Sequence, residues 1–143
     1  MKEIFVDTWY FIALTHKRDV SHKSAKEIAS SLGSTLLVTS EGVLTEFLNF
    51  FSGHGEQIRR AAVCTVKLLQ SSKQLEIIQQ NHEFFVKSLM LYQNRTDKNY
   101  SLTDCFSMKI MEERGISSVL TNDDGFRQEG YDKINKPTDL RST

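Results

Sequence analysis

Short apolar segments alternate with longer helical patterns along this chain, and no other feature limits its fold as much. The apolar segments predict strands at about residues 3–6, 35–39, 75–78 and 117–121, with a weaker one near 132–134. Helical patterns occupy the intervals, at about residues 8–16, 22–32, 41–52, 56–71, 81–93 and 102–114. Strands that alternate with helices are typical of parallel sheets with helices on both faces. The sequence therefore predicts a three-layer α/β/α fold around a short, mainly parallel central sheet.

The chain has the size of one domain. Its 143 residues are enough to bury one substantial core. Hydrophobic residues make up 39% and charged residues 25%, a balance that is typical of globular proteins and excludes a disordered chain. Neither an internal repeat nor a low-complexity tract interrupts the pattern. We therefore expect a single domain over residues 1–143.

Four acidic residues border or interrupt segments that otherwise read as buried core. Asp7 follows the first predicted strand and Asp123 the fourth, whereas Glu46 and Asp104 lie within mostly apolar helical patterns. In open α/β sheets, ligands bind beyond the carboxyl ends of the strands. Topology alone places Asp7, Glu46 and Asp123 at that edge. Asp104 joins them only if the loop before its helix turns toward the same edge.

Carboxylates that crowd together need a cation. At about 4 Å and an effective dielectric near 20, each like-charged pair costs on the order of 4 kcal/mol. Neither Asp7 nor Glu46 has a Lys or Arg within four residues, so converging acids would need positive charge from outside the chain. Oxygen ligands alone favour a hard divalent ion, Mg²⁺ or Mn²⁺. A simpler explanation stays open for some of them, because Asp7, Asp123 and Asp124 could each cap a helix.

The segments around these acids resemble the motifs of a known family, the PIN domains. This metal-dependent ribonuclease fold includes the VapC-type toxins of bacterial and archaeal toxin–antitoxin pairs, and the resemblance covers nearly the whole chain. The matching segments are Ile4-Phe5-Val6-Asp7-Thr8, Val43-Leu44-Thr45-Glu46, Tyr100-Ser101-Leu102-Thr103-Asp104-Cys105 and Val119-Leu120-Thr121-Asn122-Asp123-Asp124-Gly125-Phe126. The usual spacing in the family puts an acid three residues before a Phe, which selects Asp123 over Asp124.

The resemblance implies one PIN-like nuclease domain with a metal-dependent endoribonuclease activity. Asp7, Glu46, Asp104 and Asp123 would hold Mg²⁺ or Mn²⁺ and activate water against an RNA phosphodiester. Supporting hydroxyl or amide groups would come from Thr8, Ser101 and Asn122, and an accessory acid from Asp97 or Asp124. Its position beside Lys98 favours a simple loop residue over an accessory acid for Asp97.

The resemblance also implies partners. A toxin of this class would act on an RNA substrate, form a homodimer and bind a cognate antitoxin protein that covers the acids. Two other functions stay open, a non-catalytic PIN-like module that binds RNA or protein and a nuclease of RNA maturation. The short chain favours the toxin type, and the presence of all four acids favours catalysis.

The overall charge gives little support for a nucleic-acid partner, because 18 basic residues balance 18 acidic ones. If four acids surround a metal, the rest of the molecule carries 18 basic and 14 acidic residues, a surplus of +4. Candidate phosphate contacts are the pairs Lys17-Arg18 and Arg59-Arg60, together with Arg95 and Lys98. Solvated surface residues give the same pattern.

The cysteines and the hydropathy pattern bear on the location of the protein. Cys64 and Cys105 lie in separate apolar contexts without metal-ligand spacing, so we expect both to be reduced thiols in the core. The longest apolar runs are far shorter than a membrane span, and the first residues lack a signal region. These features predict a cytoplasmic protein without a membrane partner.

Overall fold

Five short strands form the centre of the fold. The computed structural model describes residues 2–142, without the side chains of Arg141 and Ser142. The strands are β1 (Glu3–Val6), β2 (Leu36–Ser40), β3 (Leu75–Ile78), β4 (Ser118–Leu120) and β5 (Asp132–Ile134). They lie in the order β3-β2-β1-β4-β5, and every pairing between them is parallel. The predicted strand positions and the mainly parallel sheet are confirmed.

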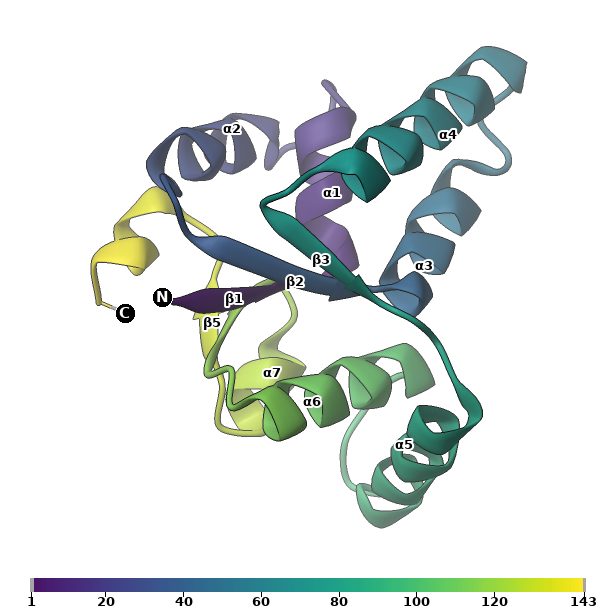
Figure 1. Cartoon of the computed structure of the whole chain (residues 1–143), viewed down its shortest axis with the longest axis vertical. Helices are drawn as coiled ribbons and strands as arrows, with labels where there is room; N and C mark the ends of the chain where they lie inside the picture. Colours follow the sequence, from purple (N-terminus) through teal and green to yellow (C-terminus); the bar gives the residue numbers. More distant parts are fainter. Residues whose placement is uncertain (1, 143) are drawn as a thin grey trace.

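Helices cover both faces of this sheet (Figure 1). Four helices come before β3 in the chain: α1 (Thr8–Thr15), α2 (His22–Ser31), α3 (Glu41–Phe51) and α4 (Glu56–Ser71). Three follow it: α5 (His82–Asn94), α6 (Leu102–Arg114) and α7 (Asp124–Gln128). In Figure 1 the first four lie above the sheet and the last three below it, which confirms the three-layer architecture. A 3₁₀ helix at Pro137–Ser142, which the sequence did not predict, closes the described chain.

The central strand β1 and its neighbours β2 and β4 explain why apolar runs mark the strands in the sequence. Phe5 in β1 lies opposite Val38 in β2 and Val119 in β4, and all three are almost fully buried. Burial on both faces removes the alternation of exposed polar residues, so the centres of these strands read as short apolar segments, and the polar residues within β2 and β4, Thr39, Ser40 and Ser118, are themselves buried.

Local capping chemistry sets the starts of the helices that surround the sheet edge. Ser40 ends β2 and its hydroxyl accepts the Val43 N–H, so α3 begins directly at the carboxyl end of that strand. Ser101 and Asp104 form a reciprocal capping box at the start of α6. Gly115 ends the same helix in the left-handed region, with a φ of 65° that disfavours a side chain. The first turns of α3 and α6 are therefore well defined.

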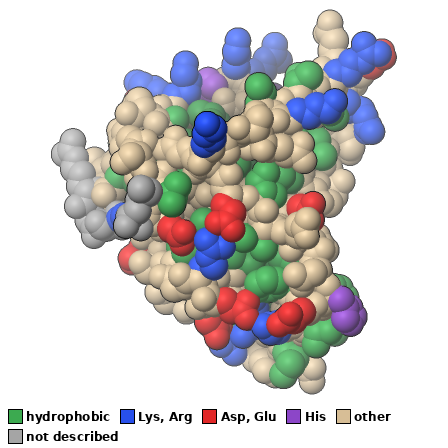
Figure 2. All heavy atoms as spheres, in the orientation of Figure 1, with side chains coloured by type: hydrophobic (Ala, Val, Ile, Leu, Met, Phe, Trp, Pro, Cys, Tyr) green, Lys and Arg blue, Asp and Glu red, His purple; other side chains and the backbone are tan. Residues whose placement is uncertain are grey.

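The two helical layers differ in charge. Residues 8–73 contain eight Lys and Arg, all of them exposed. Among the described side chains only Arg60 of this set pairs with a carboxylate. In residues 81–131, by contrast, each of the six Lys and Arg forms an ion pair. Figure 2 shows the basic side chains gathered along one margin of the molecule, over α1, α2 and α4.

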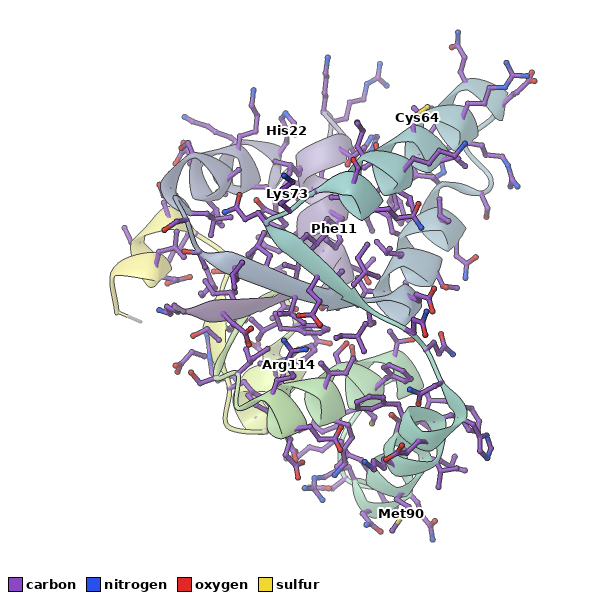
Figure 3. The ribbon with its side chains drawn as sticks, viewed as in Figure 1. Phe11, His22, Cys64, Lys73, Met90 and Arg114 are labelled. Carbon is purple, nitrogen blue, oxygen red and sulfur yellow. The ribbon has the colours of Figure 1, made fainter. Side chains whose placement is uncertain are left out.

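One expectation about the core is wrong. Cys105 is buried, but Cys64 is exposed on the outer side of α4, away from the sheet (Figure 3). The reason is that α4 packs against α3 and β3 on one side only, and Ala62 is its sole fully buried residue among those described. None of the described helices is both long and apolar enough to cross a membrane.

Candidate metal centre

Asp7 is the most deeply placed of the four predicted ligands. It follows β1 at the N-cap position of α1 but makes no capping hydrogen bond, and its side chain is 7% exposed. The buried hydroxyl of Thr121 donates to Asp7 Oδ2 over 2.7 Å. Burial raises the pKa of Asp7 to about 6; the Thr121 hydrogen bond opposes this shift, and the nearby Glu46 and Asp123 carboxylates add to it. A hydrogen bond from the Thr8 backbone N–H also lowers the pKa of Asp7, so a contact with the start of α1 is present but does not by itself explain why this carboxylate is buried.

Thr121 is a functional candidate that sequence reasoning missed. Besides binding Asp7, its hydroxyl oxygen accepts the backbone N–H of Asp123 over 3.1 Å. It thus joins the carboxyl end of β1 to the loop that carries Asp123. The available signal was a hydroxyl residue at the end of an otherwise apolar strand.

Glu46 reaches the same edge from α3. Its Oε1 atom accepts a 2.7 Å hydrogen bond from the hydroxyl of Thr8, the first residue of α1. Thr8 is therefore in contact with a predicted ligand, as the sequence suggested. The contact places α1 and α3 side by side at the carboxyl ends of β1 and β2.

Asp104 has both a local structural role and an unusual electrostatic environment. Its carboxylate accepts the Ser101 N–H at the start of α6, and the Ser101 hydroxyl accepts the Asp104 N–H. Burial raises the pKa of Asp104 to about 7 despite the backbone hydrogen bond from Ser101, and Asp7, Asp123 and Glu46 raise it further. The loop before α6 therefore does turn toward the edge that holds the other three acids.

Asp123 and its neighbour Asp124 have different surroundings. Asp123 caps α7 by accepting the Gly125 N–H, and it acts electrostatically on both Asp7 and Asp104. Asp124 is bound to Lys133 over 2.7 Å, and this hydrogen bond lowers its pKa. The electrostatic neighbourhood of Asp7 and Asp104 thus contains Asp123, whereas Asp124 serves a surface ion pair.

The chemistry of the four carboxyl groups fits a hard divalent cation. None of them pairs with a Lys or Arg among the described side chains, and two have pKa values raised by burial and by one another. However, no three His, Cys, Asp or Glu side chains in the described region are already gathered as a ligand shell. Binding an ion would therefore require the carboxylates to move closer together, which their mutual repulsion opposes while no cation is bound.

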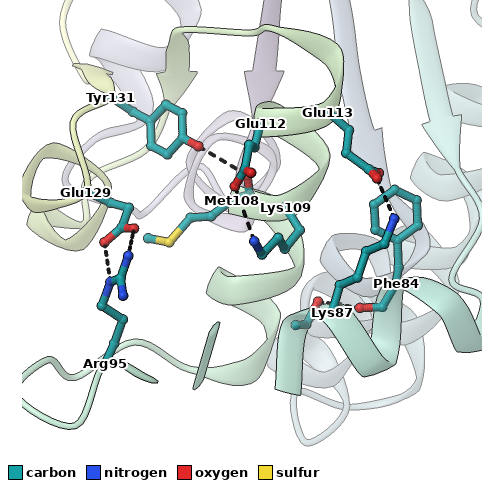
Figure 4. A network of polar contacts seen from close by, with 10 residues as sticks. Phe84, Lys87, Arg95, Met108, Lys109, Glu112, Glu113, Glu129 and Tyr131 are labelled. Atoms are coloured by element: carbon teal, nitrogen blue, oxygen red, sulfur yellow. Dashed lines mark hydrogen bonds and ion pairs between the residues drawn. The ribbon is translucent and has the colours of Figure 1, made fainter. Parts of the chain in front are cut away.

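A polar network joins the loop between α5 and α6 to Glu129, which follows α7 (Figure 4). Arg95 makes two hydrogen bonds to Glu129, at 3.0 and 2.8 Å, and the Tyr100 hydroxyl donates to the same carboxylate. Arg95 is thus occupied as a structural partner. Lys98 pairs with Asp97, whose side chain is 74% exposed. Asp97 lines a surface pocket together with Asp123 and Asp124, and its accessory role stays a prediction.

The remaining predicted residues separate into two groups. Ser101 supports Asp104 through the capping box, whereas Asn122 accepts a hydrogen bond from Asn135 and contacts none of the four acids through a described hydrogen bond. Lys17 and Arg18 are exposed and form no ion pair with a described residue, so both are free to contact phosphate.

The chain is similar along most of its length to a toxin of Mycobacterium tuberculosis. It is 28% identical over 137 residues to a protein named 23S rRNA-specific endonuclease VapC20, covering 92% of this chain and 97% of the relative. The crystal structure described as M. tuberculosis VapC20, a Sarcin-Ricin loop cleaving toxin, superposes with a TM-score of 0.81 at 24% identity, covering 92% of this chain and 98% of that one.

A second solved structure shares the fold at lower identity. VapBC2 from Rickettsia felis, bound to a DNA fragment from its promoter, superposes with a TM-score of 0.69 at 14% identity. The alignment covers 94% of this chain and 98% of that one. Finally, residues 4–130 match the sequence model of the PIN domain, a span that includes all four acids. The chain belongs to the PIN domain family.

Proposed function

We propose that the protein is a Mg²⁺- or Mn²⁺-dependent endoribonuclease and the toxin of a toxin–antitoxin pair, with residues 1–143 forming one nuclease domain. The observation that carries the proposal is the electrostatic convergence of Asp7, Glu46, Asp104 and Asp123 at one edge of the sheet without a basic partner. Repulsion of this kind is retained where a cation or a shared proton offsets it.

Each carboxylate has a defined part in the proposed site. Asp7 is oriented by Thr121 and Glu46 by Thr8, so their oxygens are directed before any ligand arrives. Asp104 and Asp123 stand at the first turns of α6 and α7. A divalent ion held there would lower the pKa of a bound water and stabilise the charge that develops on the phosphodiester.

RNA as the substrate is supported by the surface charge. The layer formed by α1 to α4 presents basic side chains that no described carboxylate neutralises, apart from Arg60. Such cations bind a phosphate backbone without regard to sequence. The similarity to a 23S rRNA-specific endonuclease makes 23S ribosomal RNA the first substrate to examine.

The proposed partners follow from the toxin type. We expect a homodimer in the cytoplasm and a cognate antitoxin that covers the acidic edge. The expectation of an antitoxin rests on the structural similarity to VapBC2 from Rickettsia felis. Sedimentation of the purified protein tests the dimer, and loss of cleavage on addition of a candidate antitoxin protein tests the second partner.

The test of the activity is cleavage of intact ribosomes and of purified total RNA. The protein is incubated with Mn²⁺, with Mg²⁺ or with EDTA, beside an Asp104→Asn variant and an Asp132→Asn control. Asp132 is an exposed carboxylate on β5, so its replacement removes one charge outside the acidic edge. Cleavage that needs the metal and is lost only in Asp104→Asn supports the proposal. A protein that binds the metal but cleaves neither substrate would favour the binding-module alternative.

A further inference from the structure

Four aromatic rings meet where α1 and α3 end. His16 follows α1, Phe50 and Phe51 end α3, and His54 lies in the turn before α4. The His16 ring centroid is 6.4 Å from that of Phe50 and 6.3 Å from that of His54, and the Phe50 and His54 centroids are 5.3 Å apart. Phe51 is buried beneath them at 2% exposure, whereas Phe50 is 43% exposed. The cluster therefore has a fixed base and an open ring surface.

This ring surface continues the acidic edge along the seam between two helices. The seam begins at the hydrogen bond between Thr8 on α1 and Glu46 on α3. Phe50 follows Glu46 by four residues, about 6 Å along α3, and His16 follows Thr8 by eight, about 12 Å along α1. Since residues four apart share a helix face, Phe50 lies on the same side of α3 as Glu46. Phe50 therefore lies about one helical turn from Glu46 on the same side of α3, within the span of a short nucleotide segment.

Unpaired basic side chains flank the same rings. Lys17 and Arg18 directly follow His16, and both are exposed without an ion pair to any described residue. Arg59, five residues after His54, donates to the Ser52 carbonyl oxygen but has no carboxylate partner in the described part of the chain. These three residues are among the eight exposed Lys and Arg of residues 8–73. Exposed rings beside free cations match what single-stranded nucleic acid offers, which is flat bases on a charged backbone.

We propose that Phe50 and His54 form a stacking platform for unpaired RNA bases next to the bond that is cleaved, with Lys17 and Arg18 holding the adjoining phosphates. The inference rests on the proposed function for RNA being the substrate, and it adds a subsite for the nucleotides beside the scissile phosphodiester. Because every base has a face that can stack, the platform selects for single-stranded or splayed RNA without selecting a sequence. A fully paired duplex hides those faces and would bind only through its phosphates.

Binding is measured in EDTA, so that it does not depend on cleavage. The probes are fluorescein-labelled single-stranded RNA 12-mers of mixed sequence and a 12-base-pair RNA duplex, followed by fluorescence anisotropy. The variants are Phe50→Ala, Phe50→Trp and the double variant Lys17→Ala with Arg18→Ala. The matched control is Phe85→Ala on α5, because Phe85 is 40% exposed and stacks on His82, which copies the Phe–His pair on another face.

Phe50→Ala should weaken binding of the single strand by about 10-fold and leave the duplex nearly unchanged, since a stacked base typically contributes that much. Phe50→Trp should restore binding, and Phe85→Ala should bind as the unsubstituted protein does. The double basic variant should weaken single strand and duplex alike and reduce the salt dependence of both.

Three results would overturn the platform. One is undiminished single-strand binding by Phe50→Ala, and another is the absence of binding by the unsubstituted protein. The third is a loss of binding in Phe50→Ala that accompanies a change of mass in sedimentation, which would assign this surface to a protein contact. Failure of the proposed function looks different: the single strand would bind through Phe50 while no RNA is cleaved with Mn²⁺.

Discussion

Replacing Asp104 with Asn should stabilise the metal-free protein, and the gain should grow with pH. Asp104 has its pKa raised from 3.8 to about 7, first by burial and then by the carboxylates of Asp7, Asp123 and Glu46. Between these two values the unfolded chain has lost the proton while the folded protein still holds it. Stability therefore falls as pH rises through this interval, and the full penalty is present above pH 7. Asn has no proton to lose and escapes the penalty.

The size of the effect follows from the shift. Each pKa unit corresponds to about 1.4 kcal/mol, so a shift of about three units sets an upper limit near 4 kcal/mol. Partial exposure of Asp104 and its coupled titration with the other acids reduce this to roughly 2 kcal/mol. For a chain of this size, about 2 kcal/mol raises the Tm by roughly 6 °C. Asn can still accept the Ser101 N–H, so the capping box is kept.

The assay is thermal unfolding at pH 4.5 and pH 8, in EDTA and in Mn²⁺. In EDTA, Asp104→Asn should unfold near the unsubstituted protein at pH 4.5 and about 6 °C above it at pH 8. With Mn²⁺ the order should reverse, because the unsubstituted protein gains binding energy that the variant lacks. Asp132→Asn controls for the loss of a negative charge. A variant no more stable than the parent at pH 8 in EDTA would refute the electrostatic argument.

Three other substitutions test separate parts of the structure. Thr121→Val removes the hydroxyl that orients Asp7 and should lower manganese affinity, measured by calorimetry, by about 10- to 100-fold, while Thr121→Ser retains it. Gly125→Ala should reduce cleavage in an RNA assay while leaving the fold measured by circular dichroism intact, because the added Cβ would lie 3.1 Å from the Tyr100 ring and 3.2 Å from Asp123 Oδ1 and would displace both. Ser107→Ala should raise the midpoint of urea unfolding, since the buried Ser107 hydroxyl has no described partner and its removal spares up to about 1 kcal/mol of desolvation.

The architecture could be predicted from the sequence because buried strands and helices appear in it as characteristic patterns of apolar residues. The buried residues Ile4 to Val6 of β1 and Val119-Leu120 of β4 appear as apolar segments, and the helical patterns between the strands predicted the positions of α1 to α6. The same pattern of apolar residues gave a wrong prediction for a helix that is buried on one side only. The apolar residues of α4 suggested core, yet Cys64 is exposed because α4 is packed from one side only.

The position of Asp104 shows what the sequence left undecided. Nothing in the local pattern says which way the loop before α6 turns. That is settled by contacts between distant residues, in which Glu129 binds Arg95 and Tyr100 across 34 and 29 positions of the chain. Contacts between residues so far apart in the sequence produce no recognisable local sequence pattern.

The sequence by itself determined which residue types stand at the ends of the strands and helices, and hence the family and the identity of the four acids. Tertiary structure decided their electrostatics. The pKa values of Asp7 and Asp104 rise because folding removes water and brings the carboxylates together, and Thr121 becomes a link between two of the acids only when β1 and β4 lie side by side. Spacing along a chain can name such groups, but the energy of their interaction depends on distance and on solvent, which exist only in the folded molecule.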